Sequence, residues 1–445
     1  MSNKSILVWF RNDLRVHDNE ILHEAVQKSS RIIPVYIFDP RYYSSTPFGT
    51  QKTGKFRTKF ILESVQDLKT SLQNLGGDLL VLNGKPEEIL PGIVKKYQAD
   101  EVYHHREVAA EETGISSSVE DALWKMQINL KHFIGHTLYH KEDLPFPIKD
   151  IPDIFNKFRK KTEREGEIRP VFPTPESITV PEDLETSAVP SLKDLGFDDF
   201  DLDERAVLDF KGGETEGLKR LHYYLWDSDL LKKYKQTRDQ LIGGDYSSKL
   251  SPWLSAGCLS PREVYWEVNK YEKERGSNDS TYLLIFELLW RDYFRFMFKK
   301  HGTHYFIPEE SNDPEKNLTE EDTGKFEKWK QGETGMPFID ANMRELLYTG
   351  FMSSRGRQNV ASYFVNELGL NWTLGAAYFE EMLIDYSPSS NWGNWAYIAG
   401  PNSTVVPLNI ARQAKDFDPQ AEYMKLWLPD MKNISSESME ELHKI

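Results

Sequence analysis

The stretch from Asp385 to Gly400 reads DYSPSSNWGNWAYIAG, and it constrains the chain more than any other segment. Two tryptophans and two tyrosines stand there among small residues, together with Asp385, Asn391 and Asn394. Large rings usually form plain core, because each one buries about 150–250 Å². A purely apolar core, however, offers no partners for a carboxylate and two amides. The mixture suits a flat ligand rich in nitrogen and oxygen, such as a flavin, and predicts a buried cofactor site.

A second polar segment lies upstream, at residues 353–359, and reads SSRGRQN. It contains Arg355 and Arg357, and arginine binds carboxylates or phosphates through two parallel hydrogen bonds. The two segments together therefore predict one buried site for a polar cofactor.

The first third of the chain alternates between short apolar runs and helical patterns. The β-branched runs at 5–10 and 31–38 predict buried strands, with a helix at 19–28 between them. The pattern continues with strands at 78–82, 100–104 and 128–134 and with helices at 55–75, 86–97 and 116–127. This alternation predicts a doubly wound parallel sheet. Since no Gly-x-Gly-x-x-Gly follows the first strand, a nucleotide has to bind elsewhere.

The rest of the chain divides into a connector and a helical region. After an α/β domain at 1–135, residues 136–215 are rich in proline and acid and predict a connector with little regular structure. Residues 216–430 predict an all-α domain, and 431–445 a short tail. The expected helices lie at 281–300, 343–348, 359–367 and 374–384. The first of these is apolar on most sides and is expected to be largely buried.

Composition limits the class of protein. At 445 residues, the chain is long enough for two or three domains. It has no run of about 18 apolar residues and no signal peptide pattern, so no membrane span is expected. The single cysteine, Cys258, excludes an internal disulfide, predicts a packed thiol and favours a reducing, cytoplasmic compartment. No metal site is readable, and a monomer is expected.

The net charge of −15 argues against a nucleic-acid partner, but the charge is unevenly distributed. Residues 181–210 hold ten acidic and two basic residues, and residues 306–325 hold seven and two. Residues 211–300, by contrast, hold sixteen basic and thirteen acidic residues. A local basic face over the cofactor domain is therefore compatible with the composition.

Five further motifs follow one another along the chain. They are WFRNDLRVHDN at 9–19, LPF at 144–146, RP at 169–170, KLSPW at 249–253 and FELLWRD at 286–292. With the two segments above, they resemble the photolyase/cryptochrome family, and in particular its DASH cryptochrome branch. The resemblance spans nearly the whole chain. It implies an N-terminal antenna-binding domain and a C-terminal helical FAD-binding domain.

The resemblance implies a light-driven DNA lyase. In the family, reduced FAD, excited directly or through a methenyltetrahydrofolate antenna, gives an electron to a cyclobutane pyrimidine dimer, and the electron returns after the ring splits. The alternative is a blue-light flavin receptor that signals or binds nucleic acid without repair. A long C-terminal extension would favour the receptor. Here only a short tail is expected after the last family segment, which ends near Pro429, and this favours the enzyme. Repair of (6-4) lesions would want a nearby histidine, and residues 353–400 contain none.

Three residues of the 286–292 motif carry expected roles. By resemblance, Glu287 bonds the substrate base, Trp290 stacks on the damaged bases, and Arg291 lies by the flavin. Glu287 and Arg291 are four residues apart, so an intrahelical ion pair is the simpler alternative. Their apolar neighbours make such a pair buried, and a buried pair is costly without further partners.

The loop from Gly243 to Ser251 reads GGDYSSKLS. Its backbone N–H groups and hydroxyls can form a nest for a diphosphate, although a solvated turn fits the pattern equally well. By resemblance, the residues that hold the flavin diphosphate are Ser247, Ser248, Lys249, Leu250 and Ser251. Tyr234 matches a flavin-contacting tyrosine upstream of this loop.

The resemblance also assigns residues beside the flavin ring. Arg357 and Asp385 match a salt-bridged pair, and Asn391 matches the residue that faces flavin N5. An amide donates or accepts, so it suits either protonation state of N5. Ser354 and Ser387 depart from the usual Asn and Asp of the family, and Ser387 removes a negative charge near the flavin.

Trp395 and Trp372 match the inner two members of the tryptophan chain that photoreduces the flavin in the family. Two ordinary core tryptophans are the alternative. Thr319 stands near the place of the outer member. Either another aromatic residue completes the relay, or photoreduction is slow. The aromatic residues nearby in the sequence are Tyr305, Phe306 and Trp329.

Substrate preference is expected from the residues at the substrate-facing positions. Tyr397 and Gln358 are typical of the DASH branch, and they make the pocket smaller and more polar. Extruding a base costs a few kcal/mol, and less when the DNA is already single-stranded. We therefore expect a preference for pyrimidine dimers in single-stranded DNA. Arg238 and Arg355 match phosphate-contacting arginines.

In the first domain, Glu107 matches the carboxylate that binds the pterin ring of methenyltetrahydrofolate. A carboxylate suits the N–H donors of a pterin, although a surface glutamate at a strand end is the simpler alternative. Arg11, Asp13 and Arg15 are expected to tie the two domains together.

Overall fold

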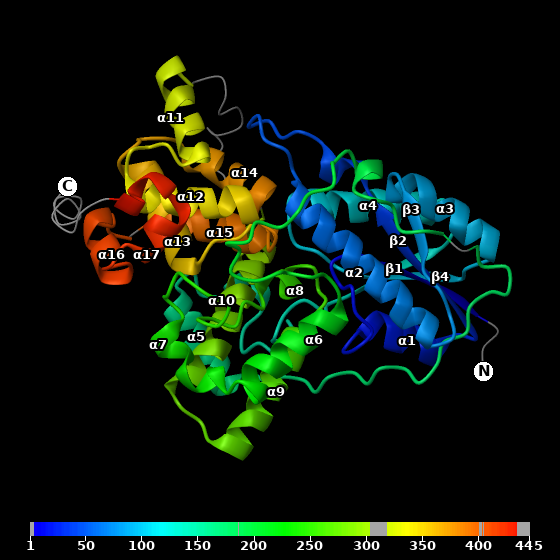
Figure 1. Cartoon of the computed structure of the whole chain (residues 1–445). Coiled ribbons are helices and arrows are strands. Elements are labelled where there is room, and N and C mark those ends of the chain that lie inside the picture. Colours follow the sequence, from blue (N-terminus) through cyan, green and yellow to red (C-terminus); the bar gives the residue numbers. More distant parts are fainter. Residues whose placement is uncertain (1–3, 186, 303–317, 400–402, 404, 434–445) are drawn as a thin grey trace.

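Five parallel strands form one sheet in the first third of the chain, and helices build the remainder (Figure 1). The computed structural model describes residues 4–185, 187–302, 318–399, 403 and 405–433. The strands are β1 (Ser5–Phe10), β2 (Arg31–Phe38), β3 (Leu80–Asn83), β4 (Glu101–His105) and β5 (Asn129–Phe133). Their order, β3-β2-β1-β4-β5, is the doubly wound arrangement that the sequence pattern predicts.

Helices cover both faces of this sheet, so every residue of β1 is buried. They are α1 (Glu20–Lys28), α2 (Lys55–Asn74), α3 (Pro86–Tyr97) and α4 (Ala110–Trp124). Helices α1 and α2 pack on the face that carries Ile6 and Val8, and α3 and α4 pack on the opposite face. The helix predicted at 116–127 begins earlier, at Ala110. Glu111 and Glu112 favour its first turn through the helix dipole, although that turn lacks apolar periodicity.

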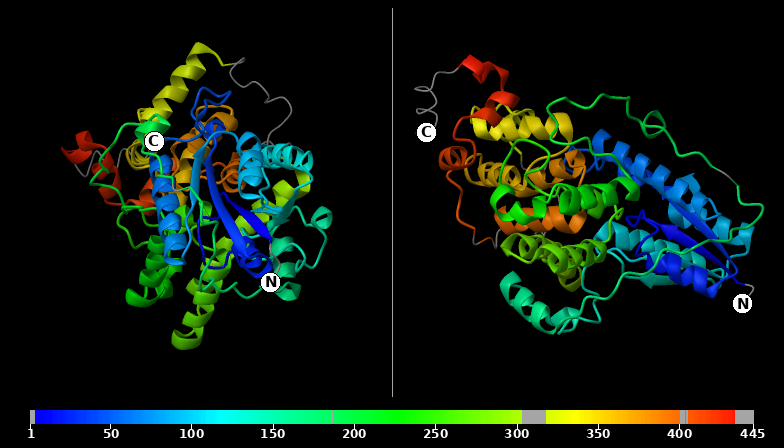
Figure 2. Two further views of the ribbon diagram at one scale, coloured as in Figure 1. Left: turned by 90° about the vertical axis from the view of Figure 1, so that its right-hand side faces the viewer. Right: turned by 60° about the horizontal axis from the view of Figure 1, so that its bottom comes forward.

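The connector contains a helix, α5 (Phe155–Glu165), so the prediction of little regular structure is wrong for this segment. Its apolar positions are few and hidden among charges. The residues it buries at helical spacing are Phe155, Phe158 and Thr162. Beyond α5 the chain runs as an extended coil along the sheet domain (green, Figure 2). The N–H of Ile178 donates there to the carbonyl of Leu75 at 2.8 Å.

The helical domain surrounds one long central helix, α10. Its helices are α6 (Glu214–His222), α7 (Tyr234–Thr237), α8 (Ser251–Ser255), α9 (Pro261–Arg275), α10 (Asp279–His301), α11 (Glu320–Gln331), α12 (Pro337–Thr349), α13 (Ser354–Asn366), α14 (Trp372–Met382), α15 (Pro388–Ala399), α16 (Ile410–Phe417) and α17 (Glu422–Trp427). Short 3₁₀ segments lie at Pro40–Tyr43, Ile148–Asp150, Lys193–Leu195, Leu230–Lys233 and Pro429–Asn433, and a π turn at Tyr223–Asp227. Most of the aromatic stretch after Asp385 forms α15, whose first residue, Pro388, suits a helix start.

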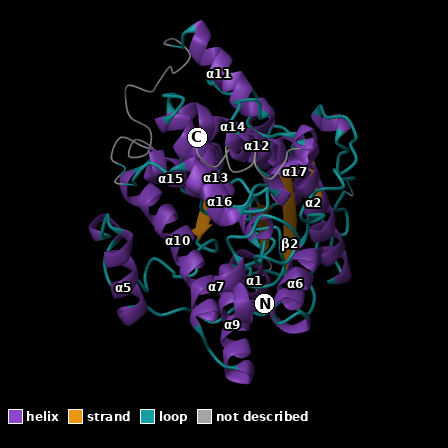
Figure 3. Cartoon of the chain, turned by 60° about the vertical axis from the view of Figure 1, so that its left-hand side comes forward, coloured by secondary structure: helices purple, strands orange, loops and turns teal. Residues whose placement is uncertain are grey.

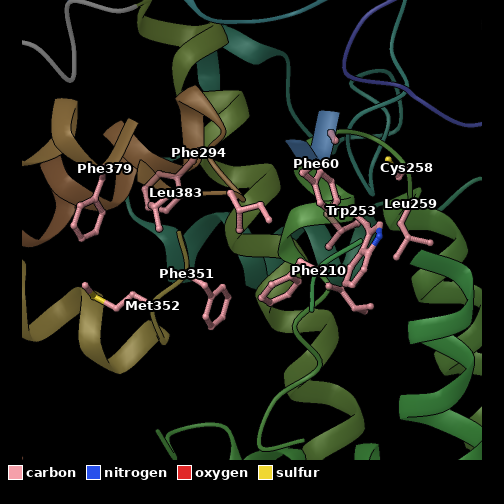
Figure 4. Close-up of a cluster of buried hydrophobic side chains, with 14 of the residues drawn as sticks. Phe60, Phe210, Trp253, Cys258, Leu259, Phe294, Phe351, Met352, Phe379 and Leu383 are labelled. Carbon is pink, nitrogen blue, oxygen red and sulfur yellow. The ribbon is translucent and has the colours of Figure 1, made fainter. Parts of the chain in front are cut away.

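An aromatic cluster joins the two domains (Figure 4). The ring centroid of Trp253, on α8, lies 6.0 Å from that of Phe60 on α2 and 5.8 Å from that of Phe210 in the connector. Cys258 packs nearby and is fully buried, and burial raises the pKa of its thiol to about 12. The prediction of a packed thiol is confirmed.

A buried ion pair between Asp18 and Arg262 fixes α9 against the sheet domain. Arg262 donates to both oxygens of Asp18, from Nε at 2.9 Å and from Nη2 at 2.7 Å. The hydroxyl of Ser260 and the N–H of Phe172 donate to the same carboxylate. Because a carboxylate loses several kcal/mol of hydration on burial, these donors are what make its position stable.

Arg15 forms a second tie, as expected. Its guanidinium donates to Gly257 O at 2.8 Å and to Gly135 O at 2.9 Å. Gly257 has a φ of +69°, and a Cβ there would lie 1.8 Å from Asn12 O. Only glycine therefore allows the helical domain to approach this closely.

Arg11 and Asp13 do not tie the domains, so that expectation is wrong for these two residues. Arg11 donates to Ser116 Oγ at 2.9 Å, and Asp13 Oδ2 lies 2.6 Å from His105 Nδ1. Both bonds stay within the sheet domain. Asp18, five residues beyond Asp13 in the same motif, makes the interdomain pair instead.

The described ranges contain neither a membrane-spanning helix nor a cluster of side chains that could hold a metal ion. None of the helices there is long and apolar enough to cross a membrane. The same ranges contain no group of three or more His, Cys, Asp or Glu side chains placed to hold a metal ion.

Arg262→Met leaves Asp18 buried without its main partner. Removing one partner of a buried ion pair costs about 3–5 kcal/mol, so we expect a clearly lower urea midpoint, followed by tryptophan fluorescence. Arg412→Met is the control, because Arg412 is exposed and its helical pair with Asp416 contributes only about 0.3–0.5 kcal/mol. Equal midpoints for the two variants would contradict the stabilising role of the buried pair.

Candidate functional site

A cavity of about 550 Å³ lies among α10, α13, α15 and the loop before α8. This volume is within the range of small-molecule sites, about 300–1,000 Å³. The predicted site residues that line it are Tyr234, Arg238, Ser247, Ser248, Lys249, Leu250, Ser251, Glu287, Trp290, Arg291, Arg357, Gln358, Asp385, Ser387, Asn391, Trp395 and Tyr397. Three others, Arg355, Trp372 and Glu107, lie outside this lining.

Arg220, on α6, shapes the loop at 243–251. Its buried guanidinium donates to the carbonyls of Ser248 (3.0 Å), Gly244 (2.8 Å) and Ser247 (3.2 Å). These bonds hold the loop in one shape beside the cavity. Sequence motifs do not reveal Arg220, because it stands 28 residues before Ser248 and belongs to none of them.

Lys249 is the most constrained residue of this loop. Its φ of +54° is uncommon for a residue with a side chain. Its ammonium lies 3.0 Å from the centroid of the Tyr246 ring, and burial lowers the pKa of Lys249 well below its usual value. An anion in the cavity would favour the charged form, as a role beside a diphosphate requires.

Three buried polar atoms in the cavity wall have no hydrogen-bond partner within the described chain: Lys249 Nζ, Tyr246 Oη and Asp385 Oδ1. Buried polar atoms are nearly always paired, so these atoms indicate a ligand that offers both donors and acceptors. FAD offers both through its diphosphate, hydroxyl groups and ring. The residues present therefore fit this cofactor.

Asp385 is held on one side and faces the cavity on the other. Its Oδ2 accepts from Arg357 Nη2 at 2.8 Å and from the Ser251 hydroxyl at 2.6 Å. Arg357 also donates from Nε to Met352 O at 2.9 Å, which fixes the guanidinium. The ion pair that the resemblance implies is present, and it links α13 to the segment just before α15, while the Ser251 bond adds the first residue of α8.

Asn391 is buried on α15 and oriented by the neighbouring helix. Its Nδ2 donates to the carbonyl of Ala376, on α14, at 2.9 Å. An amide carries two N–H donors and one acceptor oxygen, so a ligand can use the groups not bonded to Ala376. Ser387, one turn earlier, lines the same cavity, and its carbonyl accepts from the backbone N–H of Asn391.

Glu287 forms an ion pair with Arg238 at the partly exposed edge of the cavity. The intrahelical alternative is wrong, because Arg291 donates instead to the carbonyls of His136 and Leu254. Burial lowers the pKa of Arg291 to about 10, which still leaves it charged at neutral pH. Glu287 is thus paired with the residue expected to contact a phosphate.

Trp290 and Tyr397 form an aromatic edge of the cavity, with ring centroids 5.3 Å apart. Tyr397 is 49% exposed, as a substrate-facing residue has to be. Trp290 stacks on Phe155 of α5, at a centroid distance of 3.6 Å and an angle of 13°. Phe155, which belongs to none of the sequence motifs, fixes the orientation of the Trp290 ring.

Arg355 lies beside the cavity rather than in its wall. Its Nη1 donates to Oε1 of Gln358, a lining residue, at 3.1 Å. Its Nη2 lies 3.2 Å from Asp239, and its guanidinium lies over the Phe417 ring at 4.4 Å. We therefore expect Arg355 to contact a phosphate at the outer rim of the cavity rather than inside it.

The tryptophans of the expected relay contact different partners. Trp395 lines the cavity, and its close packing requires Gly375, where a Cβ would lie 2.3 Å from Trp395 Cη2. Its ring centroid lies 6.3 Å from that of Trp329. Trp372 contacts Trp392 instead, with 5.9 Å between their centroids.

Of the candidates for the outer relay position, Trp329 is the one that the structure places against Trp395. Thr319 is the N-cap of α11, where its hydroxyl accepts from the N–H of Asp322. Tyr305 and Phe306 lie outside the described residues. Trp329 is fully buried, so it is a neighbour of the inner tryptophan rather than a surface exit.

Glu107 lines a second cavity, of about 330 Å³, at the carboxyl ends of β1 and β2. One of its oxygens accepts from Asn12 Nδ2 at 3.0 Å, and the other pairs with Arg295 of α10 at 2.9 Å. The carboxylate therefore bonds across the domain interface. Its role toward a pterin antenna stays a prediction.

Comparison with known proteins supplies the class. The family model "DNA photolyase" matches residues 6–177, and "FAD binding domain of DNA photolyase" matches residues 284–445. Cryptochrome DASH of Gloeobacter violaceus is 48% identical, over 100% of this chain and 89% of its own length. The Xenopus laevis protein of that name is 46% identical, over 97% and 84%. The Synechocystis sp. cryptochrome structure matches with a TM-score of 0.92 and 46% identity, over 99% of this chain and 94% of that one.

The sheet domain, the helical domain and the cavity between its helices thus define the architecture of a DNA photolyase. The chain belongs to the photolyase/cryptochrome family, within its DASH cryptochrome branch. The resemblance drawn from the sequence motifs is confirmed.

Arg220→Met removes the guanidinium that donates to three carbonyls of the loop at 243–251. A hydrogen bond to a charged group contributes about 1.5–3 kcal/mol, so we expect FAD to bind roughly ten- to a hundredfold more weakly. Titration of the apoprotein with FAD, followed by flavin fluorescence, measures this change. Lys219→Met, at an exposed neighbouring position on α6, is the control and should bind FAD like the parent protein. Unchanged affinity of the Arg220 variant would refute this role.

Trp329→Phe keeps a ring against Trp395 but removes an oxidisable indole. We expect slower blue-light reduction of bound oxidised flavin in the presence of a thiol, measured by bleaching of the flavin absorption band. Trp266→Phe, on α9, is the control, because its indole bonds to Arg169 O away from the cavity. Slowing by Trp372→Phe together with parental rates for the Trp329 variant would show that the electron does not pass through Trp329.

Proposed function

We propose that this protein uses reduced FAD and light to repair cyclobutane pyrimidine dimers, with a preference for single-stranded DNA. One observation carries the proposal. Glu287 and Trp290, the expected substrate contacts, line the same cavity as Asn391 and Asp385, the expected flavin contacts. An extruded dimer and the flavin can therefore meet directly, as electron transfer between them requires.

The residues of the cavity hold and orient the two reactants. When bound, the reduced flavin supplies the light-driven electron that splits the cyclobutane ring, and it receives the electron back. Arg357 keeps Asp385 directed at the cofactor, and Ala376 keeps the Asn391 amide in one orientation. These fixed dipoles need no rearrangement during the reaction.

When substrate binds, the ion pair between Arg238 and Glu287 can be exchanged for two contacts with the DNA. Glu287 offers a carboxylate acceptor to the N–H groups of a flipped pyrimidine. When the base binds to Glu287, Arg238 becomes available to a flanking phosphate. One side chain then contacts the base while its former partner contacts the backbone.

We expect a preference for single-stranded DNA because the pocket binds an extruded dimer only weakly. Its edge is Trp290 and a half-exposed Tyr397, next to the polar Gln358. Such a pocket offsets little of the few kcal/mol needed to extrude a dimer from a duplex. A dimer in a single strand avoids most of this cost.

A blue-light receptor that binds flavin without repair is the second candidate. The observation that favours it is the existing bond between Glu287 and Arg238, since the proposed substrate acceptor already has a partner. The two candidates differ in one measurable property, the light-dependent loss of dimers.

The test uses protein whose flavin is chemically reduced, so that photoreduction plays no part. Under illumination, we expect recovery of intact thymines from a single-stranded dimer oligonucleotide and much less from the duplex, against dark controls. Glu287→Gln should slow repair roughly ten- to a hundredfold, because it loses a charged hydrogen bond of about 1.5–3 kcal/mol. Glu274→Gln, at an exposed position on α9, is the matched control. Absence of repair in both substrates would leave the receptor.

A further inference from the structure

Helix α5 of the connector presents a basic face beside the cavity. It carries five basic and two acidic residues, in a chain whose net charge is −15. Its apolar side packs inward, and its charged side faces solvent. Figure 3 shows α5 alongside α10, the helix that carries Glu287 and Trp290, the expected substrate contacts in the cavity.

Three lysines on this face have no carboxylate partner. Arg159 pairs with Glu163, and Arg164 pairs with Glu165. No ion pair within the described residues involves the remaining basic residues of the helix, which are Lys157, Lys160 and Lys161. Positions three and four apart share one helix face, so the three ammonium groups form a single cationic stripe.

Aromatic contacts fix α5, and with it the lysine stripe, against residues that line the cavity. Phe155, at the start of α5, lies 3.6 Å from the Trp290 ring and 5.3 Å from the Phe286 ring. Arg159 covers the Phe286 ring at 5.6 Å and donates to the Tyr282 hydroxyl at 2.7 Å. Both Trp290 and Phe286 line the cavity. A helix anchored in this way holds its charges at a set position relative to the cavity.

We propose that α5 is a phosphate-binding element that guides the DNA strand beside the cavity, through Lys157, Lys160 and Lys161. The inference rests on the proposed function for the identity of the strand. From Lys157 to Lys161 the helix rises about 6 Å, and nucleotides of a stacked strand are spaced about 3.4 Å apart. The stripe therefore matches the phosphates of two or three nucleotides that flank the base in the cavity.

Lysines without a carboxylate partner also suit this partner physically. Within the described residues, the only aromatic contact among the three is that of Lys161, whose ammonium lies 5.5 Å from the centroid of the Phe146 ring. Each phosphate contact releases a counterion, and this release drives binding without reading sequence. An otherwise acidic protein needs such a local cationic face to hold a polyanion. The stripe supplies it at the place where a strand leaves the aromatic edge formed by Trp290 and Tyr397.

The test measures binding of a fluorescent single-stranded dimer oligonucleotide by anisotropy across a salt series. Three proteins with bound flavin are compared in the dark: the parent, Lys157→Gln/Lys160→Gln/Lys161→Gln, and Lys95→Gln/Lys96→Gln/Lys125→Gln. The second triple variant removes the same charge from exposed lysines of the sheet domain. Each contact contributes about 0.7 to the slope of log affinity against log salt, so the α5 variant should lose about 2. Its loss of affinity at 50 mM salt should exceed that at 200 mM about twentyfold.

Three results would overturn the proposal: a parental slope for the α5 variant, an equal loss in both variants, or no binding by any of the proteins. Light-driven repair by the parent protein is measured on the same oligonucleotide. Repair with an unchanged α5 slope rejects the stripe and keeps the proposed function. A reduced α5 slope without repair keeps the stripe and rejects the lyase.

Discussion

The carboxylate of Asp18 is the interaction on which the arrangement of the two domains depends. It has no exposed surface, and it accepts hydrogen bonds from Arg262 in the helical domain and from Phe172 in the connector. An ionised carboxylate is stable away from water only when its oxygens are well bonded. The three segments therefore cannot move apart without leaving a buried charge unpaired. The same contacts hold the left-handed backbone of Asp18, at φ +41°.

A similar constraint reaches the cavity through α10. Asp292 accepts from the backbone N–H groups of Leu138 and Tyr139, each at 2.9 Å, so this helix is clamped to the chain just beyond β5. Glu287 and Trp290 lie on the preceding turns of the same helix. Because a helix is stiff over this length, Glu287 and Trp290 take their position from contacts that α10 makes with the start of the connector. The geometry of the site is thus a property of the whole chain.

Local sequence patterns predict the sheet well, and they predict less of what depends on distant partners. The apolar runs at 5–10 and 31–38 coincide with β1 and β2, because strands buried on both faces read as continuous β-branched segments. The cavity residues follow from motifs. Arg220 and Phe155 do not, since each acts on residues far along the chain, and local periodicity carries no information about such a partner. Helix α5 is missed for a related reason, as its buried side has very few apolar residues.

The separation of Asp18 and Arg262 along the chain has a consequence during synthesis. They are 244 residues apart, and ribosomes add about 5–20 residues per second, so roughly 12–50 s pass before Asp18 can meet its partner. Domains generally fold as they emerge. The nascent sheet domain must therefore keep Asp18 hydrated, and the interface can lose its water only when α9 arrives. Domain docking is then a late, dehydrating step, separate from the folding of the sheet.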